Sequence, residues 1–367
     1  MKAAGTLIPI LFLAIITVAV WYISRRSAWM FNIRPLWCYI FFAILTFCSF
    51  SAVLGYGSSS TSGEFMHYVT VTLCYICGIL IILLLALLFT DLVNLIYPLS
   101  KLFFASSTIV LTTIVALYGF LHAASPKLKS IEIELPKLNE EISVIQLSDI
   151  HLGHFRSGAH LQKIVDIVNS TDAKMVLITG DLFDSHYNLS PATLEPLKSL
   201  KMPAFFVDGN HDGYTDIKRI KQMVADCGVA VLNNQAVECC GVEITGFAMP
   251  PITSATMHAV QGDSIIRGYL DSVELLKELP SIVLHHSPVG AEHIAKAGAD
   301  LYLSGHTHGG QFFPMTLFNS HFFDYNRGLY RLGNLQIYVS EGSGTFGIPM
   351  RFGTDSEITL LKLKPKQ

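Results

Sequence analysis

The order of apolar and polar positions divides the chain into two parts of different character. Four nearly unbroken apolar runs, separated by short polar stretches, cover residues 7–23, 36–54, 69–89 and 102–121. A helix needs about 17–25 apolar residues to cross a hydrocarbon core of about 30 Å, and each run has a length of that order. The pattern therefore predicts a membrane region of four transmembrane helices over residues 1–122.

Beyond residue 122 the apolar runs become short and alternate with amphipathic stretches, which is typical of an α/β domain. Strands are predicted at residues 131–135, 142–147, 175–178, 204–207, 230–232, 236–239, 243–247, 281–284, 299–303, 335–339 and 357–363. Helices are predicted at residues 159–169, 192–200, 216–226, 271–278 and 289–297. We expect the three short strands between residues 230 and 247 to be antiparallel.

The domain organisation follows from this change of pattern. Residues 1–122 form the membrane region, residues 123–141 a linker with the first strand, and residues 142–367 a single soluble domain. The aromatic segment 312–332 has no clear periodicity, so we interpret it as a loop over the functional site. It either faces lipid or packs over the sheet, and the sequence leaves both interpretations open.

Charge is distributed in the same two-part manner. The soluble part contains 20 of the 25 Lys and Arg residues and 26 of the 28 Asp and Glu residues. Its excess of negative charge argues against general nucleic-acid binding, which requires a basic surface. Cys74 and Cys77 have the spacing of a redox or zinc site, but they lie inside an apolar run and are interpreted as helix packing.

The basic residues next to the apolar runs favour one orientation. Arg25, Arg26 and Arg34 lie between the first two runs, whereas the loop 55–67 has no Lys or Arg. The positive-inside rule then places the first loop in the cytoplasm and the soluble domain outside it. Basic residues after the fourth run act in the opposite direction. The expectation is a multi-pass protein of the plasma or inner membrane with an extracytoplasmic soluble domain.

Polar side chains gather where the predicted strands end. The ends carry, in chain order, Asp149 with His151, Asp181, Asn210 with His211, His286, and His306 with His308. In α/β sheets, ligands bind at the carboxyl ends of the strands. Two carboxylates, an amide and several imidazoles exceed the needs of one tetrahedral zinc ion. They fit two divalent ions about 3.5–4 Å apart, for which Mn, Fe or Zn are all compatible with the mixed nitrogen and oxygen ligands.

These residues resemble a known family. The ordered set Asp149-x-His151, Gly180-Asp181, Gly209-Asn210-His211-Asp212, His286 and Gly305-His306-x-His308 is similar to the motifs of the calcineurin-like metallophosphoesterases. The tail from Tyr338 to Arg351 resembles the subgroup with a multi-helix membrane region, the transmembrane proteins with a metallophosphoesterase domain. The family fold implies two stacked mixed β-sheets flanked by helices.

The resemblance also implies roles for the residues of the motifs. Asp149, His151 and His308 would hold one metal ion, Asn210, His286 and His306 a second, and Asp181 would bridge the two. His285, the neighbour of His286, is the alternative ligand. His211 would protonate the leaving oxygen while Asp212 holds its ring. The nucleophile would be a metal-bound hydroxide.

The predicted function is therefore a membrane-anchored, two-metal phosphoesterase that hydrolyses a phosphomonoester, phosphodiester or pyrophosphate. The membrane region suggests a lipid phosphate as one class of substrate, hydrolysed in the membrane plane. Two alternatives belong to other classes of protein. A catalytically silent receptor or scaffold would lack a ligand residue, and a transporter would place charges inside its apolar runs.

Overall fold

The computed structural model describes residues 2–57, 63–250, 263–271, 273, 275 and 278–366. The chain divides into two compact units. The helical unit is formed mainly by residues 1–121, and the larger α/β unit mainly by residues 122–346 and 351–367. Each unit is described by itself below.

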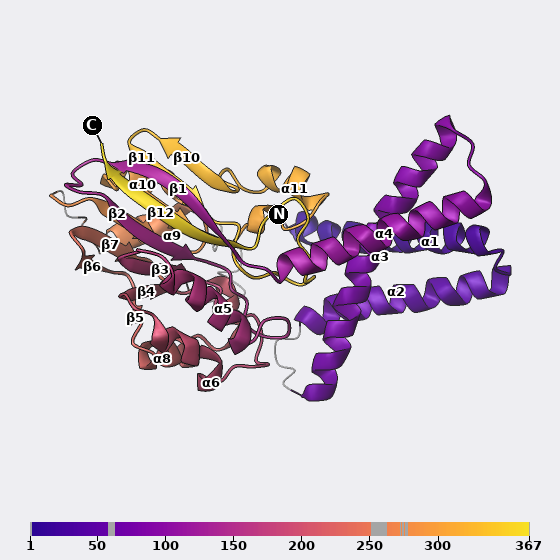
Figure 1. Cartoon of the computed structure of the whole chain (residues 1–367), viewed down its shortest axis with the longest axis horizontal. Coiled ribbons are helices and arrows are strands. Elements are labelled where there is room, and N and C mark those ends of the chain that lie inside the picture. Colours follow the sequence, from indigo (N-terminus) through magenta and orange to yellow (C-terminus); the bar gives the residue numbers. More distant parts are fainter. Residues whose placement is uncertain are drawn as a thin grey trace. The chain divides into compact units, whose positions relative to one another are not determined.

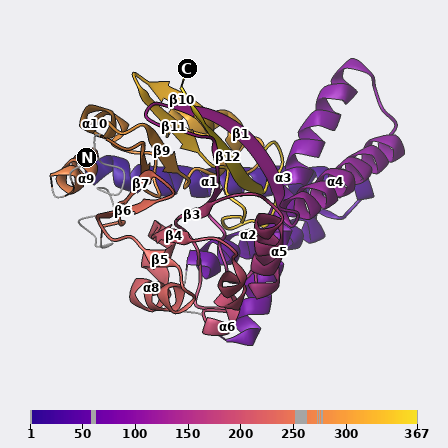
Figure 2. The ribbon, with the colours of Figure 1, turned by 60° about the vertical axis from the view of Figure 1, so that its left-hand side comes forward.

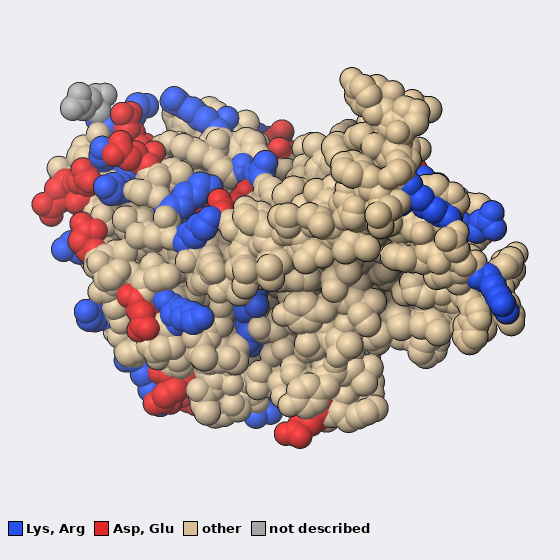
Figure 3. All heavy atoms as spheres, turned by 45° about the vertical axis from the view of Figure 1, so that its right-hand side comes forward, with Lys and Arg blue, Asp and Glu red and all other residues tan. Residues whose placement is uncertain are grey.

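The helical unit consists of the four predicted helices. They are α1 (Lys2–Phe31), α2 (Pro35–Gly57), α3 (Glu64–Ile96) and α4 (Lys101–Ala123). Among the described residues, α3 and α4 have the length and apolar composition to cross a membrane, and α2 contributes a shorter apolar stretch. The helices are present as predicted, whereas four membrane crossings remain a prediction. Lys, Arg, Asp and Glu are sparse on this unit and frequent on the α/β unit (Figure 3).

The α/β unit contains two six-stranded mixed sheets, as predicted (Figure 1). The first has the order β1-β12-β2-β3-β4-β5. Its strands are β1 (Lys127–Leu135), β12 (Glu357–Pro365), β2 (Ile142–Leu147), β3 (Met175–Thr179), β4 (Ala204–Val207) and β5 (Ala230–Val231). Strands β2 to β5 are parallel to one another, and β12 is antiparallel to β2. Their carboxyl ends therefore meet at one edge of the sheet.

The second sheet has the order β10-β11-β9-β8-β7-β6. Its strands are β10 (Gly328–Leu332), β11 (Leu335–Val339), β9 (Leu301–Ser304), β8 (Ser281–Leu284), β7 (Val242–Gly246) and β6 (Gln235–Cys239). The four central strands are parallel, and the two outer strands are antiparallel to their neighbours.

The two sheets pack face to face. Their shared core contains Val144 and Leu177 of the first sheet together with Ile282 and Leu303 of the second, all fully buried. A second core lies between the first sheet and the helices α5 (Gly158–Asn169), α6 (Pro191–Leu194), η1 (Glu195–Ser199) and α8 (Ile217–Asp226) (Figure 2). A third core packs α9 (Asp263–Leu270) and α10 (Ala291–Ala297) on the second sheet.

Several local predictions are corrected by the structure. Strand β5 pairs parallel with β4, so only β6 and β7 of the three short strands are antiparallel. The segment 312–332 is not wholly irregular, because it contains α11 (Met315–Phe318), η4 (Asn319–His321) and β10. The helix predicted at 271–278 lies partly outside the described residues, and its described positions are not helical.

Candidate metal centre

The predicted ligands lie at the carboxyl ends of neighbouring strands. Asp149 and His151 follow β2, Asp181 follows β3, and Asn210 begins the short helix α7 (Asn210–Thr215) after β4. His286 follows β8, while His306 and His308 follow β9 in the other sheet. The backbone N–H of His306 donates to the carboxylate of Asp149 at 3.0 Å, which joins the ends of the two sheets directly.

The first group consists of Asp149, His151 and His308, all buried. Nε2 of His151 lies 3.1 Å from Nε2 of His308, and that nitrogen lies 3.4 Å from Oδ1 of Asp149. Two neutral imidazoles cannot share such a short separation through their lone pairs unless a proton or a cation lies between them. The donor set therefore fits a divalent cation with mixed nitrogen and oxygen ligands.

The second group consists of Asp181, His286 and His306. Nε2 of His286 lies 3.1 Å from Oδ2 of Asp181 and 3.2 Å from Nδ1 of His306. The same Oδ2 lies 3.7 Å from Nε2 of His151 in the first group. Asp181 thus stands between the two groups.

Asn210 supplies an independent test of the fit to a metal. Its side chain is buried, and its Oδ1 atom has no hydrogen-bond partner. A buried polar atom without a partner costs about 1–3 kcal/mol, so such an atom needs an explanation. A cation held beside Asp181 and His286 would supply the missing partner.

The backbone of the centre is strained at the residues that carry the ligands. Asp149, His151, Asp181, His306 and His308 all have φ between 50° and 74°, the left-handed region that non-glycine residues rarely adopt. Such conformations cost roughly 1 kcal/mol or more each and persist where the surrounding structure holds them. Here they turn successive side chains at the strand ends toward one centre.

Two glycines make room for the carboxylates. A Cβ atom at Gly209 would stand 2.1 Å from Oδ1 of Asp181, and one at Gly305 would stand 2.2 Å from Oδ2 of Asp149. Any larger residue would displace a carboxylate, so these positions require glycine for close approach.

The ionisation of the second group concentrates positive charge on one ring. Burial alone would lower the pKa of His286, but the facing Asp181 outweighs burial and raises it to about 10. Although burial opposes it, His286 holds the pKa of Asp181 well below its usual range. Burial lowers the pKa of His306 to about 3, so its ring stays neutral. A metal ion bound here would displace a proton from His286.

In the first group, the protonation states of the two histidines suit metal ligands. Burial lowers the pKa of His151 and of His308 well below the ordinary value, so both rings are neutral and offer lone pairs. Burial raises the pKa of Asp149 to about 6, because a buried carboxylate lacks solvation. A cation would restore the ionised form of Asp149.

Comparison with known proteins finds a family match over the segment that contains these ligand residues. The calcineurin-like phosphoesterase family matches residues 142–310. A metallophosphoesterase of Campylobacter jejuni is 31% identical over 273 residues, which cover 73% of this chain and 71% of that protein. The chain belongs to the calcineurin-like phosphoesterases.

Two other relatives of the family are longer than the aligned region. A metallophosphoesterase of Helicobacter pylori is 36% identical over 66% of this chain and 65% of its own length. The "Transmembrane protein with metallophosphoesterase domain" of Danio rerio is 34% identical over 70% of this chain and 62% of its own length. This chain therefore covers slightly less than two thirds of both relatives.

The remaining motif residues of this phosphoesterase, His211 and Asp212, have different surroundings. The ring of His211 lies beside that of His151, with centroids 4.9 Å apart. In the part of the chain that the structure describes, the carboxylate of Asp212 has no hydrogen bond to that ring, and its role in orienting His211 stays a prediction. Its oxygens accept the backbone N–H groups of Gly209 and Phe183, both at 2.9 Å. Asp212 caps the start of α7 and ties it to the loop after β3.

His285 and His286 point in different directions, as neighbours in an extended segment must. Nδ1 of His285 contacts the carbonyl oxygen of Ser287 at 2.8 Å, away from the metal groups. Nδ1 of His286 contacts the carbonyl oxygen of Thr179 at 2.8 Å, which leaves Nε2 toward Asp181. The geometry favours His286 over His285.

Arg351 is completely buried, which its place in an irregular segment did not predict. Its guanidinium donates to the carbonyl oxygens of Glu341, Gly342 and Gly344, at 2.6–3.0 Å. The N–H of Gly344 in turn donates to the carbonyl oxygen of Asp149 at 2.7 Å. Arg351 thus braces the loop that supports the first group, and it does not face a substrate phosphate.

Two other arginines, Arg156 and Arg327, are also engaged by the protein. Arg156 donates to the carbonyl oxygen of Ala123 at 2.6 Å. Arg327 pairs with Glu341 at 3.0 Å and donates to the carbonyl oxygen of Gly353 at 2.8 Å. Asp184 lies 3.7 Å from Nδ1 of His151, on the side of the ring that faces away from the metal group.

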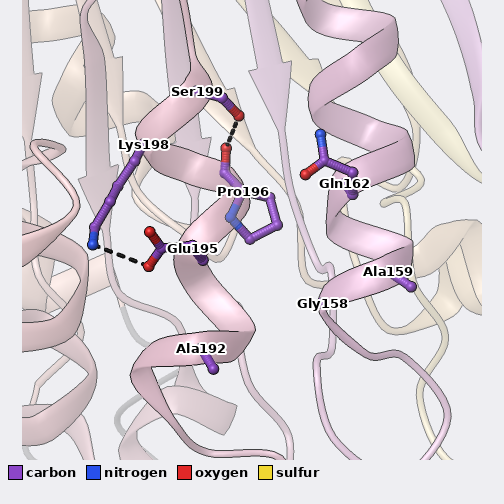
Figure 4. A pocket seen from close by; sticks show the side chains of 8 residues that line it. All are labelled: Gly158, Ala159, Gln162, Ala192, Glu195, Pro196, Lys198 and Ser199. Atoms are coloured by element: carbon purple, nitrogen blue, oxygen red, sulfur yellow. Dashed lines mark hydrogen bonds and ion pairs between the residues drawn. The ribbon is translucent and has the colours of Figure 1, made fainter.

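One hollow of the α/β unit lies away from this centre. It measures about 640 Å³ and lies between α5 and the α6–η1 segment (Figure 4). Its charged side chains, Lys198 and Glu195, form an exposed ion pair with each other. We assign the chemistry to the strand ends, because that is where buried titratable groups converge.

Proposed function

We propose that this chain is a phosphoesterase that uses two divalent metal ions. The observation that carries the proposal is the position of one carboxylate, Asp181, between two buried ligand groups. Asp149, His151 and His308 would hold one ion, Asn210, His286 and His306 the other, with Asp181 shared. Ions bound there would activate water for attack on phosphorus and offset the charge of the phosphoryl oxygens.

The remaining residues would assist bond cleavage. Attack by water breaks the bond between phosphorus and the leaving oxygen, which must then receive a proton. His211 stands beside the first group and is half-buried, so it is placed to donate that proton. Burial lowers the pKa of His211, which makes a proton on its ring easier to transfer. The strained strand ends hold the ligands in position before substrate arrives.

The proposal is tested with the full chain in detergent. After loading with Mn²⁺, it should hydrolyse a chromogenic phosphomonoester, a phosphodiester or a pyrophosphate, and a chelator should abolish the activity. Elemental analysis should find two metal ions per chain. A folded chain that binds two ions and hydrolyses none of these substrates would contradict the enzymatic role and support a receptor or scaffold. Parallel loading with Fe and Zn identifies the most active metal.

We further propose that the helical unit anchors the enzyme in a membrane by four crossings. Two apolar helices of sufficient length and the name of the Danio rerio relative support membrane association. The arginines in the last turns of α1 and in the turn before α2 favour an α/β unit outside the cytoplasm. Protease protection in sealed vesicles tests this orientation. An α/β unit outside the cytoplasm is cut by protease added to the extracytoplasmic side, whereas a cytoplasmic unit is cut only by protease on the cytoplasmic side.

A lipid phosphate is a second proposal about the substrate. Among the described residues, the segment after the metal centre exposes several large apolar side chains, with Leu317 59% and Phe322 72% exposed. Exposed apolar groups of this kind favour contact with lipid. Hydrolysis rates for lipid phosphates in micelles, compared with those for soluble nucleotides, distinguish a lipid enzyme from a general phosphatase.

A further inference from the structure

A smaller hollow of about 320 Å³ adjoins the second ligand group. It lies between the turn that leads from β8 into α10 and the segment after η4. Phe323 forms part of its wall and packs edge-on against the ring of His306, with centroids 5.5 Å apart. Pro288, two residues beyond His286, lines the opposite wall. A substrate phosphate at the metal centre would therefore have its alcohol part within reach of this hollow.

The wall of the hollow has an unusual combination of groups. Three aromatic residues line it, Phe322, Phe323 and Tyr325, together with the carboxylates of Glu292 and Asp324. No Lys or Arg belongs to the lining that the structure describes. Glu292 forms an ion pair with Lys296, in which Nζ lies 3.9 Å from Oε2, and both side chains are about three-quarters exposed. An ion pair that exposed contributes little, so Lys296 competes weakly with another cation for Glu292.

This combination favours a cation over other ligands. Aromatic faces attract an ammonium group by about 0.5–2 kcal/mol, and quaternary ammonium ligands are recognised in this way. Carboxylates add a favourable charge, whereas an anionic group would be repelled. A long alkyl chain would find a mostly polar wall, because backbone and carboxylate atoms contribute much of it.

We propose that this hollow binds an ammonium group on the alcohol part of the phosphoester substrate. The inference rests on the proposed function, because it needs the phosphate to lie at the metal centre. It narrows the substrate class to phosphoesters of amino alcohols, whether free or as the head group of a lipid.

The test compares two substrates of nearly the same shape. Choline phosphate and 3,3-dimethylbutyl phosphate differ by the replacement of a charged nitrogen with carbon. The full chain in detergent, loaded with Mn²⁺, should hydrolyse the charged ester with a kcat/KM at least about tenfold higher. Equal values for the two esters would overturn the inference while leaving phosphoesterase activity established.

Direct binding provides a readout that does not require turnover. Titration calorimetry on the full chain should detect choline and give a weaker signal for 3,3-dimethylbutanol. Asp324→Asn and Phe322→Leu should each move the ratio of the two affinities toward one. Glu195→Gln, a carboxylate of the larger hollow, is the matched control and should leave the ratio unchanged. Equal affinities in the unmodified chain would refute the ammonium site even if no phosphoester is hydrolysed.

A second pair of substrates distinguishes the two sources of the ammonium group. In mixed micelles, phosphatidylcholine provides a head-group alcohol with an ammonium group, and phosphatidylglycerol provides one without. Faster release of choline from the lipid than from choline phosphate assigns the site to a lipid head group, and the reverse assigns it to a soluble ester. This lipid pair assigns only the source, because equal kcat/KM values for the two soluble esters overturn the proposal whatever the lipid result.

Discussion

Nη2 of Arg351 lies 3.3 Å from Nδ1 of His308, the ring nitrogen that faces away from Asp149. The same guanidinium binds three backbone carbonyl oxygens of the loop that supports Asp149. One buried side chain thus contacts a ligand of the first group and the backbone that positions another. Burial lowers the pKa of Arg351 to about 10, which leaves it charged at neutral pH.

Replacement of Arg351 tests this bracing role. In Arg351→Lys, one ammonium group cannot reach the acceptors that a planar guanidinium satisfies, and several hydrogen bonds of about 1 kcal/mol each are lost. We expect the melting temperature to fall by about 5 °C and the metal content of the first group to fall with it. Thermal denaturation and elemental analysis measure both effects. Arg331→Lys, at an exposed position on β10, serves as control, and an equal loss there would contradict the assignment.

The shared carboxylate should matter more for activity than any other ligand. Asp181→Asn removes the negative charge that stands between the two groups, so we expect a loss of activity of at least about 100-fold. Metal content should fall below two ions per chain. Asp172→Asn changes an exposed carboxylate after α5 and should leave both quantities unchanged. A normal rate in Asp181→Asn would rule out the two-metal arrangement.

Asp212 should behave as a structural residue. In Asp212→Ala, the buried N–H groups of Gly209 and Phe183 lose their acceptor, which costs about 2–4 kcal/mol of folding free energy. Thermal unfolding should therefore shift downward in this variant, whereas His211→Gln should lower the rate with little change in unfolding. If Asp212→Ala unfolds like the unmodified chain and only the rate falls, Asp212 acts on the ring of His211 after all.

A buried histidine away from the metal ligands makes stability depend on pH. Burial lowers the pKa of His160 to about 3, whereas a histidine in the unfolded chain has a pKa near 6.5. Between these values the unfolded chain binds a proton that the folded chain rejects. Stability is therefore complete above about pH 6.5 and decreases as the pH falls. The contribution of His160 between pH 7 and pH 5 is about 2 kcal/mol.

His160→Gln isolates this contribution. Nε2 of His160 contacts the carbonyl oxygen of Ser343 at 3.3 Å, and a glutamine amide can donate to the same acceptor without titrating. Denaturant unfolding at several pH values should show a shallower loss of stability in the variant than in the unmodified chain. His321→Gln, at an exposed position, is the matched control. Identical pH dependence in His160→Gln and the unmodified chain would contradict the prediction.

The local parts of the fold could be predicted because local patterns encode them. The run that ends at Leu147 is apolar at most positions and buried at all of them, and the polar residues that follow mark the strand end. The same reasoning applied to β3, β4, β8 and β9, so the ligand residues could be named from the sequence. Parallel pairing brings these ends together within each sheet, and the packing of the two sheets then brings the two sets of ends to one centre.

Other features depend on contacts between distant segments. Nothing local to Glu357–Pro365 shows that this strand pairs with both β1 and β2. The bracing role of Arg351 depends on how the long connection between β11 and β12 folds back on carbonyl groups 7–10 residues earlier. The cap made by Asp212 depends on Phe183, which lies 29 residues earlier. Side-chain type alone could not distinguish these roles from phosphate binding or the orientation of His211.

The position of β12 between β1 and β2 has a consequence for biosynthesis. Until residues 357–365 have left the ribosome, β1 has no backbone partner in its sheet, and β2 presents an open edge. Chains generally fold in the order of their synthesis, and unpaired edges invite aggregation. Arg351 is also among the last residues to be synthesised, so its contacts with the loop that supports Asp149 form late. A chain whose translation stops early would therefore lack a finished metal centre and would expose a strand edge that chaperones and proteases can recognise.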